Sequence, residues 1–469
     1  KCVVTRSQLY GGTGHRTPIR QRVAIGANKD GKIHSIIHDG YASTAIKDTY
    51  SEAFTMVTRM MYHTDHLRLD QKQCRLNSQM PTFMRAPAET PGMFALESAI
   101  DELAQELKID PIELRRRNEP EKDIHSGKPF SSRLLLQCLD AGAKRFGWNE
   151  RDPAPRSQSE GNWLIGQGVA AATYPFFTFP TKVRVTVHAD GRVRIDCCSQ
   201  EIGTGTRTAQ SQLLADMLDV PASRVSMELG DTALPKGGIS GGSATTASVG
   251  GAIRDAVEKL KSRLVGLAPS DSALAGVKVD EVRFENGTLV SPKGSIAIED
   301  LLSDAMKESV SVMGELNASK DSSFSKHSFG ATFVEVAVDE ELGLVRMRRM
   351  LGGYSCGTIL NKKTGRSQFI GGMIMGIGHA LHEATHWDHR LGRITNDNLA
   401  EYHIPVNADI PEIDIMWIDT ADYDASPIGA KGIGEISITG VAAAVANAVH
   451  HATGKRIRSL PITPDKVMV

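Results

Sequence analysis

The sequence contains few cysteines, few aromatic residues and no long apolar run. Six cysteines in 469 residues are too few for a scaffold held together by disulfides. Their spacing matches neither a C-x-x-C zinc site nor an iron–sulfur motif, so we expect reduced thiols and a cytoplasmic protein, or a periplasmic one exported on a partner's signal. No apolar segment approaches the roughly 20 residues that span a bilayer. No signal-peptide pattern occurs at the first residues, and we expect no membrane partner.

The sequence also lacks an excess of charge of either sign. It carries 54 Lys and Arg against 55 Asp and Glu, which gives a formal net charge of -1. This balance provides no whole-chain attraction to nucleic acid, so we expect no nucleic-acid partner. Hydrophobic residues make up 41% of the chain, which is typical of a globular enzyme. Glycine, in contrast, is abundant at 44 residues, which indicates a backbone that approaches other groups closely at many turns.

Apolar residues at two-residue and at three- to four-residue spacing divide the chain into strands and helices. Strands are expected at 22–27, 32–43, 182–188, 192–198, 224–229, 331–338, 345–351 and 413–418, with a further hairpin at 281–290. Helices are expected at 91–107, from Pro111 onward, and at 131–146, 206–218, 245–267, 363–384 and 436–453. A polar segment at 149–161 is typical of a linker. These patterns predict an α+β fold of two stacked domains, residues 1–150 and 151–469, with mixed sheets flanked by helices.

Four glycine-rich segments are predicted to precede or open helices. They cover residues 203–206, 237–243, 371–378 and 429–435. Backbone N–H groups at a helix N-terminus bind anions such as phosphates. None of the segments is a Walker loop, and none is a G-x-G-x-x-G turn in a strand–helix–strand unit. Each is therefore either a ligand contact or a tight turn that lets elements pack closely.

Two charged side chains lie where they could act on a ligand. Glu435 begins an apolar helix, so its carboxylate is either a first-turn acid that the helix dipole favours or a general base. Arg85 precedes a helix, where its guanidinium could grip a phosphate or a carbonyl, or could form a structural ion pair with Glu89. Four histidines at helical spacing have no Asp or Cys partner at matching positions, so we expect no metal held by protein side chains there: His379, His382, His386 and His389.

Several motifs occur in order along the chain. They are Arg85-Ala86-Pro87-x-Glu89-x-Pro91-Gly92, Gln200-Glu201-Ile202-Gly203-Thr204-Gly205, Ala247-Ser248-Val249, Gln368-x-x-Gly371-Gly372-x-x-Met375-Gly376-x-Gly378 and Lys431-Gly432-Ile433-Gly434-Glu435. Together they resemble the molybdenum-binding large subunit of the xanthine oxidase family, as found in bacterial aldehyde oxidoreductases and xanthine dehydrogenases. The combination is far more specific than any one motif.

The resemblance implies two molybdopterin-binding domains, with 1–150 as the C-terminal portion of the first and 151–469 as the second. The cofactor would be a molybdopterin, in bacteria usually the cytosine dinucleotide form, and the pterin rather than the protein would hold the Mo. Glu435 matches the general base that deprotonates a Mo-bound hydroxide, which attacks an aldehyde or an aromatic N-heterocycle. Electrons would leave to [2Fe-2S] and FAD cofactors on partner subunits. The positions that match cofactor contacts are Arg85, Gly203, Thr204, Ala247, Ser248, Gln368, Gly432 and Gly434.

Three departures from the family pattern bear on function. Family large subunits carry a further N-terminal segment, so we expect either a fragment or a subunit whose N-terminal part is a separate chain. Ala88 stands where glycine is usual. After Tyr174-Pro175, where related aldehyde oxidoreductases often carry an arginine, this sequence has Phe176, Phe177 and Thr178.

The Phe176–Thr178 segment is predicted to line an apolar substrate pocket, the alternative being plain core packing. Because the segment offers no cation to pair with an anionic substrate, we expect a neutral aromatic aldehyde. Two alternatives stay open. One is purine hydroxylation of the xanthine dehydrogenase type, and the other is a non-catalytic assembly or scaffold chain that lacks the cofactor.

Overall fold

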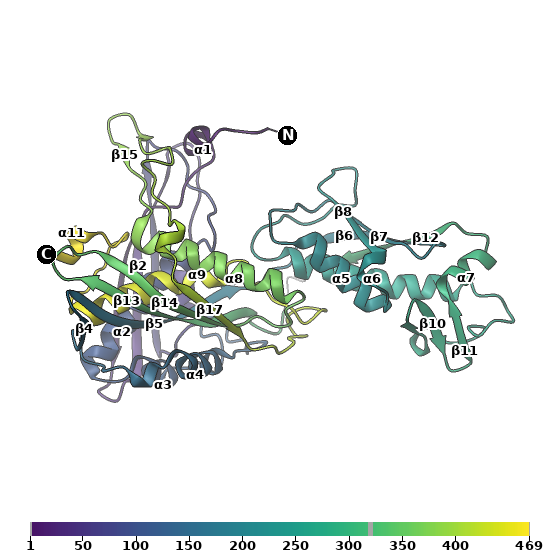
Figure 1. Cartoon of the computed structure of the whole chain (residues 1–469), viewed down its shortest axis with the longest axis horizontal. Coiled ribbons are helices and arrows are strands. Elements are labelled where there is room, and N and C mark those ends of the chain that lie inside the picture. Colours follow the sequence, from purple (N-terminus) through teal and green to yellow (C-terminus); the bar gives the residue numbers. More distant parts are fainter. Residues whose placement is uncertain (1, 318–321, 469) are drawn as a thin grey trace.

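The computed structural model describes residues 2–317 and 322–468. Figure 1 shows a large body and a smaller lobe that lie side by side along the long axis of the molecule. The lobe contains residues 181–316, which leave the body after strand β5 (Trp163–Pro175) and return to it at strand β13 (His327–Asp339). The segment 151–469 therefore contributes to both parts, and the domain boundary at residue 150 stays a prediction.

A five-stranded mixed sheet forms the middle of the body. Its order is β17-β14-β13-β5-β4, so that β14 (Val345–Ser355), β17 (Glu412–Trp417) and β4 (Gln158–Glu160) join β5 and β13. Neighbouring strands are antiparallel, except for β14 and β17, which are parallel.

Helices cover both faces of this sheet. On one face lie α8 (Lys362–Ile377), α9 (Ile436–Thr439) and α10 (Val441–Thr453), and on the other lies α4 (Leu135–Phe146). Alternate side chains of a strand point to opposite faces, so β13 contributes to both cores. Its residues on the α4 side are Phe329, Ala331 and Phe333, and those on the α10 side are Val334, Val336 and Val338.

Strand β5, next to β13, consists largely of small residues, and the sequence pattern does not predict it. Gly166 and Gly168 let α10 approach very closely, because a Cβ at these positions would lie 2.1 Å from the Ala448 oxygen and 2.2 Å from the Ala444 oxygen. Glycine and alanine have low strand propensity. The strand therefore forms because of its packing against α10 and its pairing in the sheet.

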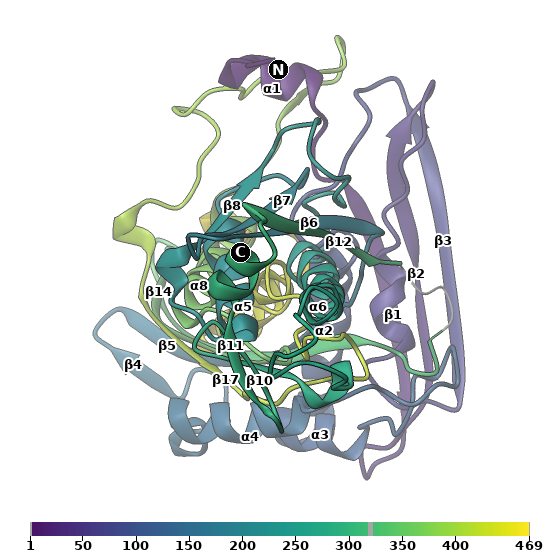
Figure 2. The same cartoon turned by 90° about the vertical axis from the view of Figure 1, so that its right-hand side faces the viewer.

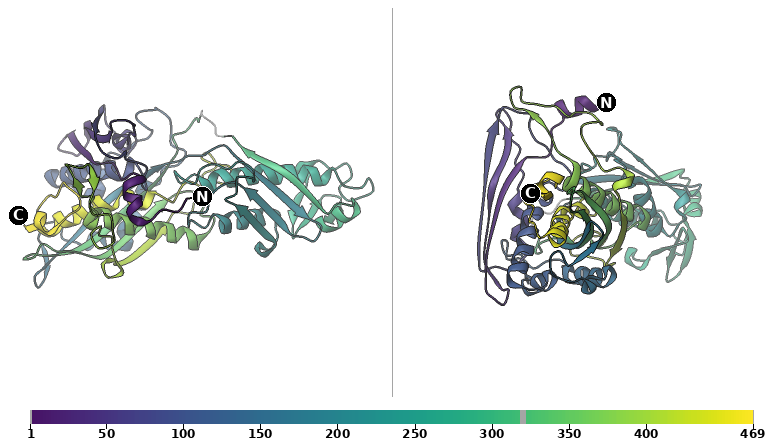
Figure 3. Two further views of the ribbon diagram at one scale, coloured as in Figure 1. Left: turned by 90° about the horizontal axis from the view of Figure 1, so that it is seen from above. Right: turned by 60° about the vertical axis from the view of Figure 1, so that its left-hand side comes forward.

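A second sheet flanks the body, as Figure 2 and the right-hand view of Figure 3 show. In it β1 (Ile19–Ala27) pairs antiparallel with β2 (Ile33–Ala45), which pairs parallel with β3 (His66–Leu76). Helix α2 (Glu89–Leu107) contacts both β1 and β5, and so lies between this sheet and the body. The predicted first hairpin and the predicted helix are confirmed, whereas β3 is not predicted by the sequence pattern.

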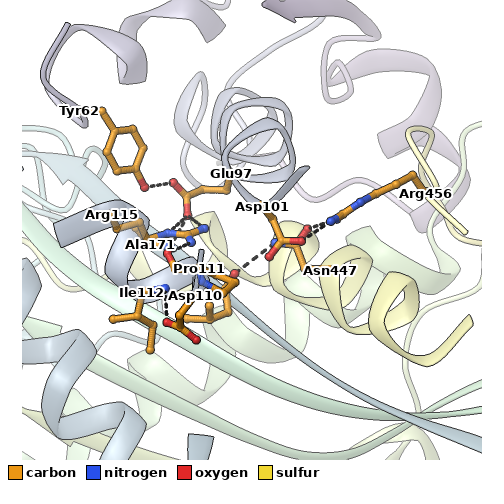
Figure 4. A network of polar contacts seen from close by, with 11 residues as sticks. Tyr62, Glu97, Asp101, Asp110, Pro111, Ile112, Arg115, Ala171, Asn447 and Arg456 are labelled. Atoms are coloured by element: carbon orange, nitrogen blue, oxygen red, sulfur yellow. Dashed lines mark hydrogen bonds and ion pairs between the residues drawn. The ribbon is translucent and has the colours of Figure 1, made fainter. Parts of the chain in front are cut away.

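A buried polar network ties α2 to α3 (Pro111–Arg117) and to β5, as Figure 4 shows. The Glu97 carboxylate accepts hydrogen bonds from Arg115 Nε at 3.0 Å and Nη2 at 2.7 Å, from Ala171 N at 2.6 Å and from the Tyr62 hydroxyl. The side chains of Glu97 and Arg115 are both 0% exposed. The network fixes α2, and with it the turn that precedes α2, to the central sheet.

The lobe contains a mixed sheet of its own, of order β12-β6-β7-β8. Its strands are β6 (Thr181–His188), β7 (Val193–Cys197), β8 (Val225–Leu229) and β12 (Ser309–Leu316). Helices α5 (Thr206–Leu218) and α6 (Thr245–Val265) share its core. A small sheet and a short helix complete the lobe: β9 (Arg283–Glu285), β10 (Thr288–Ser291), β11 (Gly294–Ala297) and α7 (Ile298–Asp304).

Two predicted helices are interrupted. The helix expected at 436–453 is divided at Gly440 into α9 and α10, and α8 ends at Ile377, where a π-helical turn over Gly378–His382 follows. Short elements complete the body: α1 (Arg6–Gly12), β15 (Trp387–Asp388), β16 (Arg393–Ile394) and α11 (Pro464–Met468). None of the helices in the described part of the chain is long and apolar enough to cross a membrane.

Candidate active site

A cavity of about 1030 Å³ lies between the body and the lobe. This volume is in the range of small-molecule and cofactor sites. The body contributes wall residues from 50–56, 83–89, 358–368 and 430–435. The lobe contributes the loops before α5 and α6, and residues 174–179 connect the two parts. Chain segments far apart in sequence therefore form a single wall.

Glu435 lies on this wall, held by groups from three elements. The Ala86 backbone N–H donates to its Oε1 at 3.1 Å, and the Ser243 hydroxyl donates to its Oε2 at 2.7 Å. The phenol of Tyr174 on β5 also lies against the carboxylate, and burial together with the charge of Glu435 raises the pKa of Tyr174. The carboxylate is thus fixed in orientation beside the cavity, as a general base requires.

The turn that carries Glu435 is anchored by a buried lysine. Lys431 Nζ lies 3.1 Å from Asp422 Oδ2 and donates to the Ser132 hydroxyl and to the His327 oxygen, both at 2.7 Å. Burial raises the pKa of Asp422, but hydrogen bonds from serine hydroxyls and the charge of Lys431 outweigh it and hold that pKa below its ordinary value. Lys431 therefore anchors the turn that carries Glu435, and its charge is paired with that of Asp422.

Glycines let the loop from the lobe reach this turn. A Cβ at Gly432 would lie 2.6 Å from the Ser243 Cβ, closer than two carbon atoms can approach. Ser243 itself has a φ of 54°, in the left-handed region, and follows the two glycines Gly241 and Gly242. The close approach is what allows the Ser243 hydroxyl to reach Glu435.

Arg85 braces the same turn from the other side. Its Nε donates to the Gly434 oxygen at 2.6 Å and its Nη2 to the Gln368 oxygen at 2.8 Å, while its Nη1 faces the Met375 sulfur at 3.6 Å. Burial lowers the pKa of the Arg85 guanidinium. The structural ion pair with Glu89 that the sequence left open does not form, because two backbone oxygens engage the guanidinium instead.

The turn from Arg85 to Glu89 has a strained backbone. Ala86 and Ala88 have φ angles of 52° and 70°, which residues with a side chain rarely adopt. Carboxylates stabilise both backbone conformations, since Ala86 N donates to Glu435 and Ala88 N donates to Glu52 Oε1 at 3.1 Å. The departure from the family's usual glycine at Ala88 therefore falls on a position that favours glycine.

The first glycine-rich loop binds a carboxylate of its own chain. The Glu201 carboxylate accepts hydrogen bonds from Gly203 N at 3.0 Å, from Gly205 N at 3.1 Å and from Arg207 N at 3.2 Å. The expected anion-binding donors before α5 are thus occupied by Glu201. Gly371–Gly376 lie within α8 rather than at its start, and Gly372 and Gly376 allow close packing against Ser437 and Val441, which agrees with the packing alternative for segment 371–378.

The other predicted cofactor contacts divide into two groups. Thr204 and Gln368 line the cavity, as do Arg85 and Gly434. Ala247 and Ser248 are buried in the first turn of α6, behind the wall. The Ser248 hydroxyl accepts a hydrogen bond from Phe179 N at 2.9 Å, so it supports the aromatic segment rather than lining the cavity. Gly203 and Gly432 are not among the wall residues either: Gly432 is buried beneath Ser243, whereas Gly203 is exposed beside open space.

Of the predicted substrate-pocket residues, Phe177 alone lines the cavity. Phe176 points elsewhere, with Lys326 Nζ 6.0 Å from the centre of its ring, and Thr178 is not part of the wall. Alternate side chains of an extended segment face opposite sides, which places Phe177 and Phe179 on the wall and Phe176 away from it. Sequence reasoning did not single out Ser243, Glu52 or Glu89 as wall residues, although Glu89 stands in the Arg85–Gly92 motif and Ser243 ends the glycine-rich segment 237–243.

Two models for molybdopterin cofactor-binding domains match the chain, one over residues 1–119 and the other over residues 141–411. The chain belongs to the molybdopterin-binding large subunits of the xanthine oxidase and aldehyde oxidoreductase family. The family prediction from the sequence motifs is confirmed, and so is an α+β fold with mixed sheets.

Curated relatives are longer than this chain. It is 37% identical over 471 residues to the aldehyde oxidoreductase molybdenum-binding subunit PaoC of Escherichia coli (strain K12), across 100% of this chain and 63% of PaoC. It is 29% identical over 486 residues to the putative xanthine dehydrogenase molybdenum-binding subunit XdhA of the same strain, across 100% of this chain and 64% of XdhA. The chain thus spans less than two thirds of the length of these relatives.

Solved structures share the fold. Quinoline 2-oxidoreductase from Pseudomonas putida 86 superimposes with a TM-score of 0.86 at 22% identity, over 99% of this chain and 63% of that one. Aldehyde oxidoreductase from Desulfovibrio gigas gives a TM-score of 0.82 at 23% identity, over 99% of this chain and 50% of that one.

The cavity wall suits a molybdopterin. Hydroxyl and carboxamide side chains from both parts of the molecule line it, namely Thr204, Ser240, Thr246, Asn361, Thr364 and Gln368. Such groups hydrogen-bond the uncharged edges of a heterocycle and the oxygens of a phosphate. A Cβ at Gly203 would meet no heavy atom within 4 Å, so this loop leaves open space beside Thr204. The residues present therefore fit the cofactor of the family.

Proposed function

We propose that this chain is the cofactor-binding part of a molybdenum hydroxylase that oxidises an uncharged aromatic aldehyde to the carboxylic acid. The observation that carries the proposal is the position of Glu435, fixed by Ala86 N, the Ser243 hydroxyl and Tyr174 on the wall of a cofactor-sized cavity. A chain with a purely scaffolding role has no use for a carboxylate so oriented. The 37% identity to PaoC, an aldehyde oxidoreductase subunit by name, supports the reaction class.

The reaction balances as RCHO + H₂O → RCOOH + 2 H⁺ + 2 e⁻. When bound, the molybdenum cofactor supplies the redox centre that transfers the oxygen and accepts the two electrons. Glu435 takes the proton of the attacking oxygen, because its carboxylate is the base that the turn presents to the cavity. Arg85 donates to the backbone oxygens of Gly434 and Gln368, so it fixes both α8 and the turn that carries Glu435.

The cofactor would lie against the hydroxyl and carboxamide side of the cavity, at Thr204 and Gln368. We assign it the cytosine dinucleotide form, which the resemblance to bacterial enzymes implies. Gly203, with open space beside it, stays a proposed cofactor contact. Ala247, Ser248 and Gly432 act from behind the wall by setting the course of the loops. We propose that these three residues shape the cofactor site.

The aldehyde would lie at the aromatic side of the cavity. Phe83, Tyr174 and Phe177 line it there. The two cations on the wall, Arg85 and Lys431, already hold protein acceptors. A buried anionic substrate would therefore have no cationic partner, and its desolvation would cost several kcal/mol of binding free energy. A neutral aldehyde would not incur this cost.

Partners must receive the electrons. The sequence has no cysteine spacing suited to an iron–sulfur cluster, so we assign [2Fe-2S] and FAD to partner subunits. A separate chain could also supply the segment that the longer relatives carry beyond this one.

The experiment is metal and nucleotide analysis of the protein purified with its natural partners, followed by turnover with three substrates. We expect about one Mo per chain, with CMP released on hydrolysis. We expect kcat/KM to be highest for benzaldehyde, lower for 4-carboxybenzaldehyde and lowest for hypoxanthine. Absence of Mo would favour the scaffold role, and a preference for hypoxanthine would favour the purine hydroxylase.

A further inference from the structure

Besides Glu435 and Glu52, the carboxyl group of Glu89 lines the cavity. Glu89 is the first residue of α2 and is 4% exposed. Across residues 2–317 and 322–468, no group of another residue hydrogen-bonds its side chain, and its own backbone N–H is the hydrogen-bond neighbour that acts on it. A buried carboxyl without a partner is costly, so a group of this kind on a cavity wall indicates a ligand that completes it.

The surroundings of Glu89 keep its proton on. Burial and the negative charges of Glu435 and Glu52 raise the pKa of Glu89 to about 8. The other titratable groups on this side are the phenols of Tyr50 and Tyr174, whose own pKa values are raised by burial. The nearby cations Arg16 and Arg85 are engaged elsewhere, since Arg16 lies 3.7 Å from Glu52 and Arg85 donates to backbone oxygens.

We propose that Glu89 donates a hydrogen bond to the acceptor atom of the bound substrate, which for an aldehyde is the carbonyl oxygen. The proposal rests on the proposed function and adds a second residue to it. When the carbonyl carbon is attacked, its oxygen gains negative charge, and a donor already in place stabilises that charge. Two of the three carboxyls on the cavity wall thereby have different tasks: Glu435 accepts a proton, and Glu89 keeps its proton and donates the hydrogen bond, while Glu52 accepts from Ala88 N.

This role selects for substrates with an acceptor at the reacting end. Aldehydes and N-heterocycles carry such an atom. Above pH 8 the Glu89 carboxyl loses its proton, so it no longer donates and adds a negative charge beside Glu435. Turnover should therefore decline on the alkaline side of that value.

The test uses the complete enzyme and two variants. Glu89→Leu removes the donor, and we expect it to lower kcat/KM for benzaldehyde about 100-fold. Glu89→Gln keeps a neutral donor that does not titrate, so we expect a loss about tenfold smaller and a kcat/KM that no longer declines above pH 8. A Glu89→Leu enzyme with the wild-type kcat/KM, or a Glu89→Gln enzyme with an unchanged alkaline decline, overturns the proposal.

A second readout needs no turnover. Because the folded chain holds the Glu89 proton up to about pH 8 while the unfolded chain releases it near its ordinary pKa, this residue makes the fold less stable as pH rises between the two values. Glu89→Gln should therefore melt at a progressively higher temperature than wild type from pH 4 to pH 8. The control Glu106→Gln, at an exposed position of the same helix, should show no such trend.

The two proposals can fail separately. Full turnover by a Mo-loaded Glu435→Gln enzyme would refute the proposed function, whatever Glu89 does. Suppose that Glu89→Gln melts at a progressively higher temperature than wild type from pH 4 to pH 8, as predicted, but Glu89→Leu keeps the wild-type turnover. Glu89 would then be protonated without acting on the substrate, which overturns this inference alone.

Discussion

The backbone of single residues explains how Glu435 and the turn after Arg85 meet. Ala86 and Ala88 turn the chain so that Ala86 N faces Glu435 and Ala88 N faces Glu52. Both residues pay a conformational cost for this, because their φ angles of 52° and 70° lie in the region that favours glycine. Hydrogen bonds to the carboxylates of Glu435 and Glu52 offset that cost.

Substituting one of these residues measures the strain. Ala88→Gly should raise the free energy of unfolding by about 0.5–1 kcal/mol, since relief of the positive φ exceeds the entropy lost by ordering a glycine. Chemical denaturation followed by circular dichroism measures this. The control is Ala95→Gly, within the same helix, which should lower the free energy of unfolding by about 1 kcal/mol. A destabilised Ala88→Gly variant would show that the turn is not strained.

At this scale the sequence predicts what a motif marks and misses what only folding brings together. Glu435 and Arg85 stand in motifs, and the structure places both on the cavity wall. Ser243 and Glu52 reach their partners across 192 and 36 residues of sequence, and no local pattern records such contacts. The sequence predicts that Phe176 lines the pocket together with Phe177, but alternation along the extended chain turns the Phe176 side chain away from the cavity.

Among the helices and strands, periodicity predicts what is amphipathic. The helix expected at 206–218 coincides with α5, and Asp110 caps α3 by accepting a hydrogen bond from Ile112 N at 2.8 Å. Strand β5 is missed because its glycines and alanines have no apolar alternation and little strand preference. Small residues suit this strand because α10 packs closely against it, and that packing is a property of the tertiary fold.

A buried ion pair attaches α2 to the rest of the body, so its removal should cause a large loss of stability. Arg115→Ala would leave the Glu97 carboxylate buried without its cation, which should cost about 3–5 kcal/mol in the free energy of unfolding. The control Arg116→Ala breaks an exposed contact with Asp140 and should cost less than about 1 kcal/mol. Equal losses in the two variants, measured by denaturation, would show that the buried network does not hold α2.

The whole molecule is built so that its site lies between two parts. Residues 181–316 fold as a lobe within the sequence of the body, and the loops before α5 and α6 complete a wall that the body begins. Composition and spacing predict mixed sheets flanked by helices, but they do not predict this insertion, because strand pairing across it depends on β5 and β13. The fold class follows from the sequence, whereas the arrangement of the wall follows from the structure.

The central claim is that this cavity is the active site of a molybdenum hydroxylase with Glu435 as its base. Turnover of benzaldehyde by the Glu435→Gln variant of the complete enzyme, measured together with its Mo content, tests the claim most directly. The amide keeps the size of the side chain but cannot take a proton, so we predict an unchanged Mo content and a kcat lowered by at least about 10²–10⁴-fold. A variant that is fully loaded with Mo and retains more than about a tenth of the wild-type kcat would contradict the account, because removal of a positioned base costs more than that.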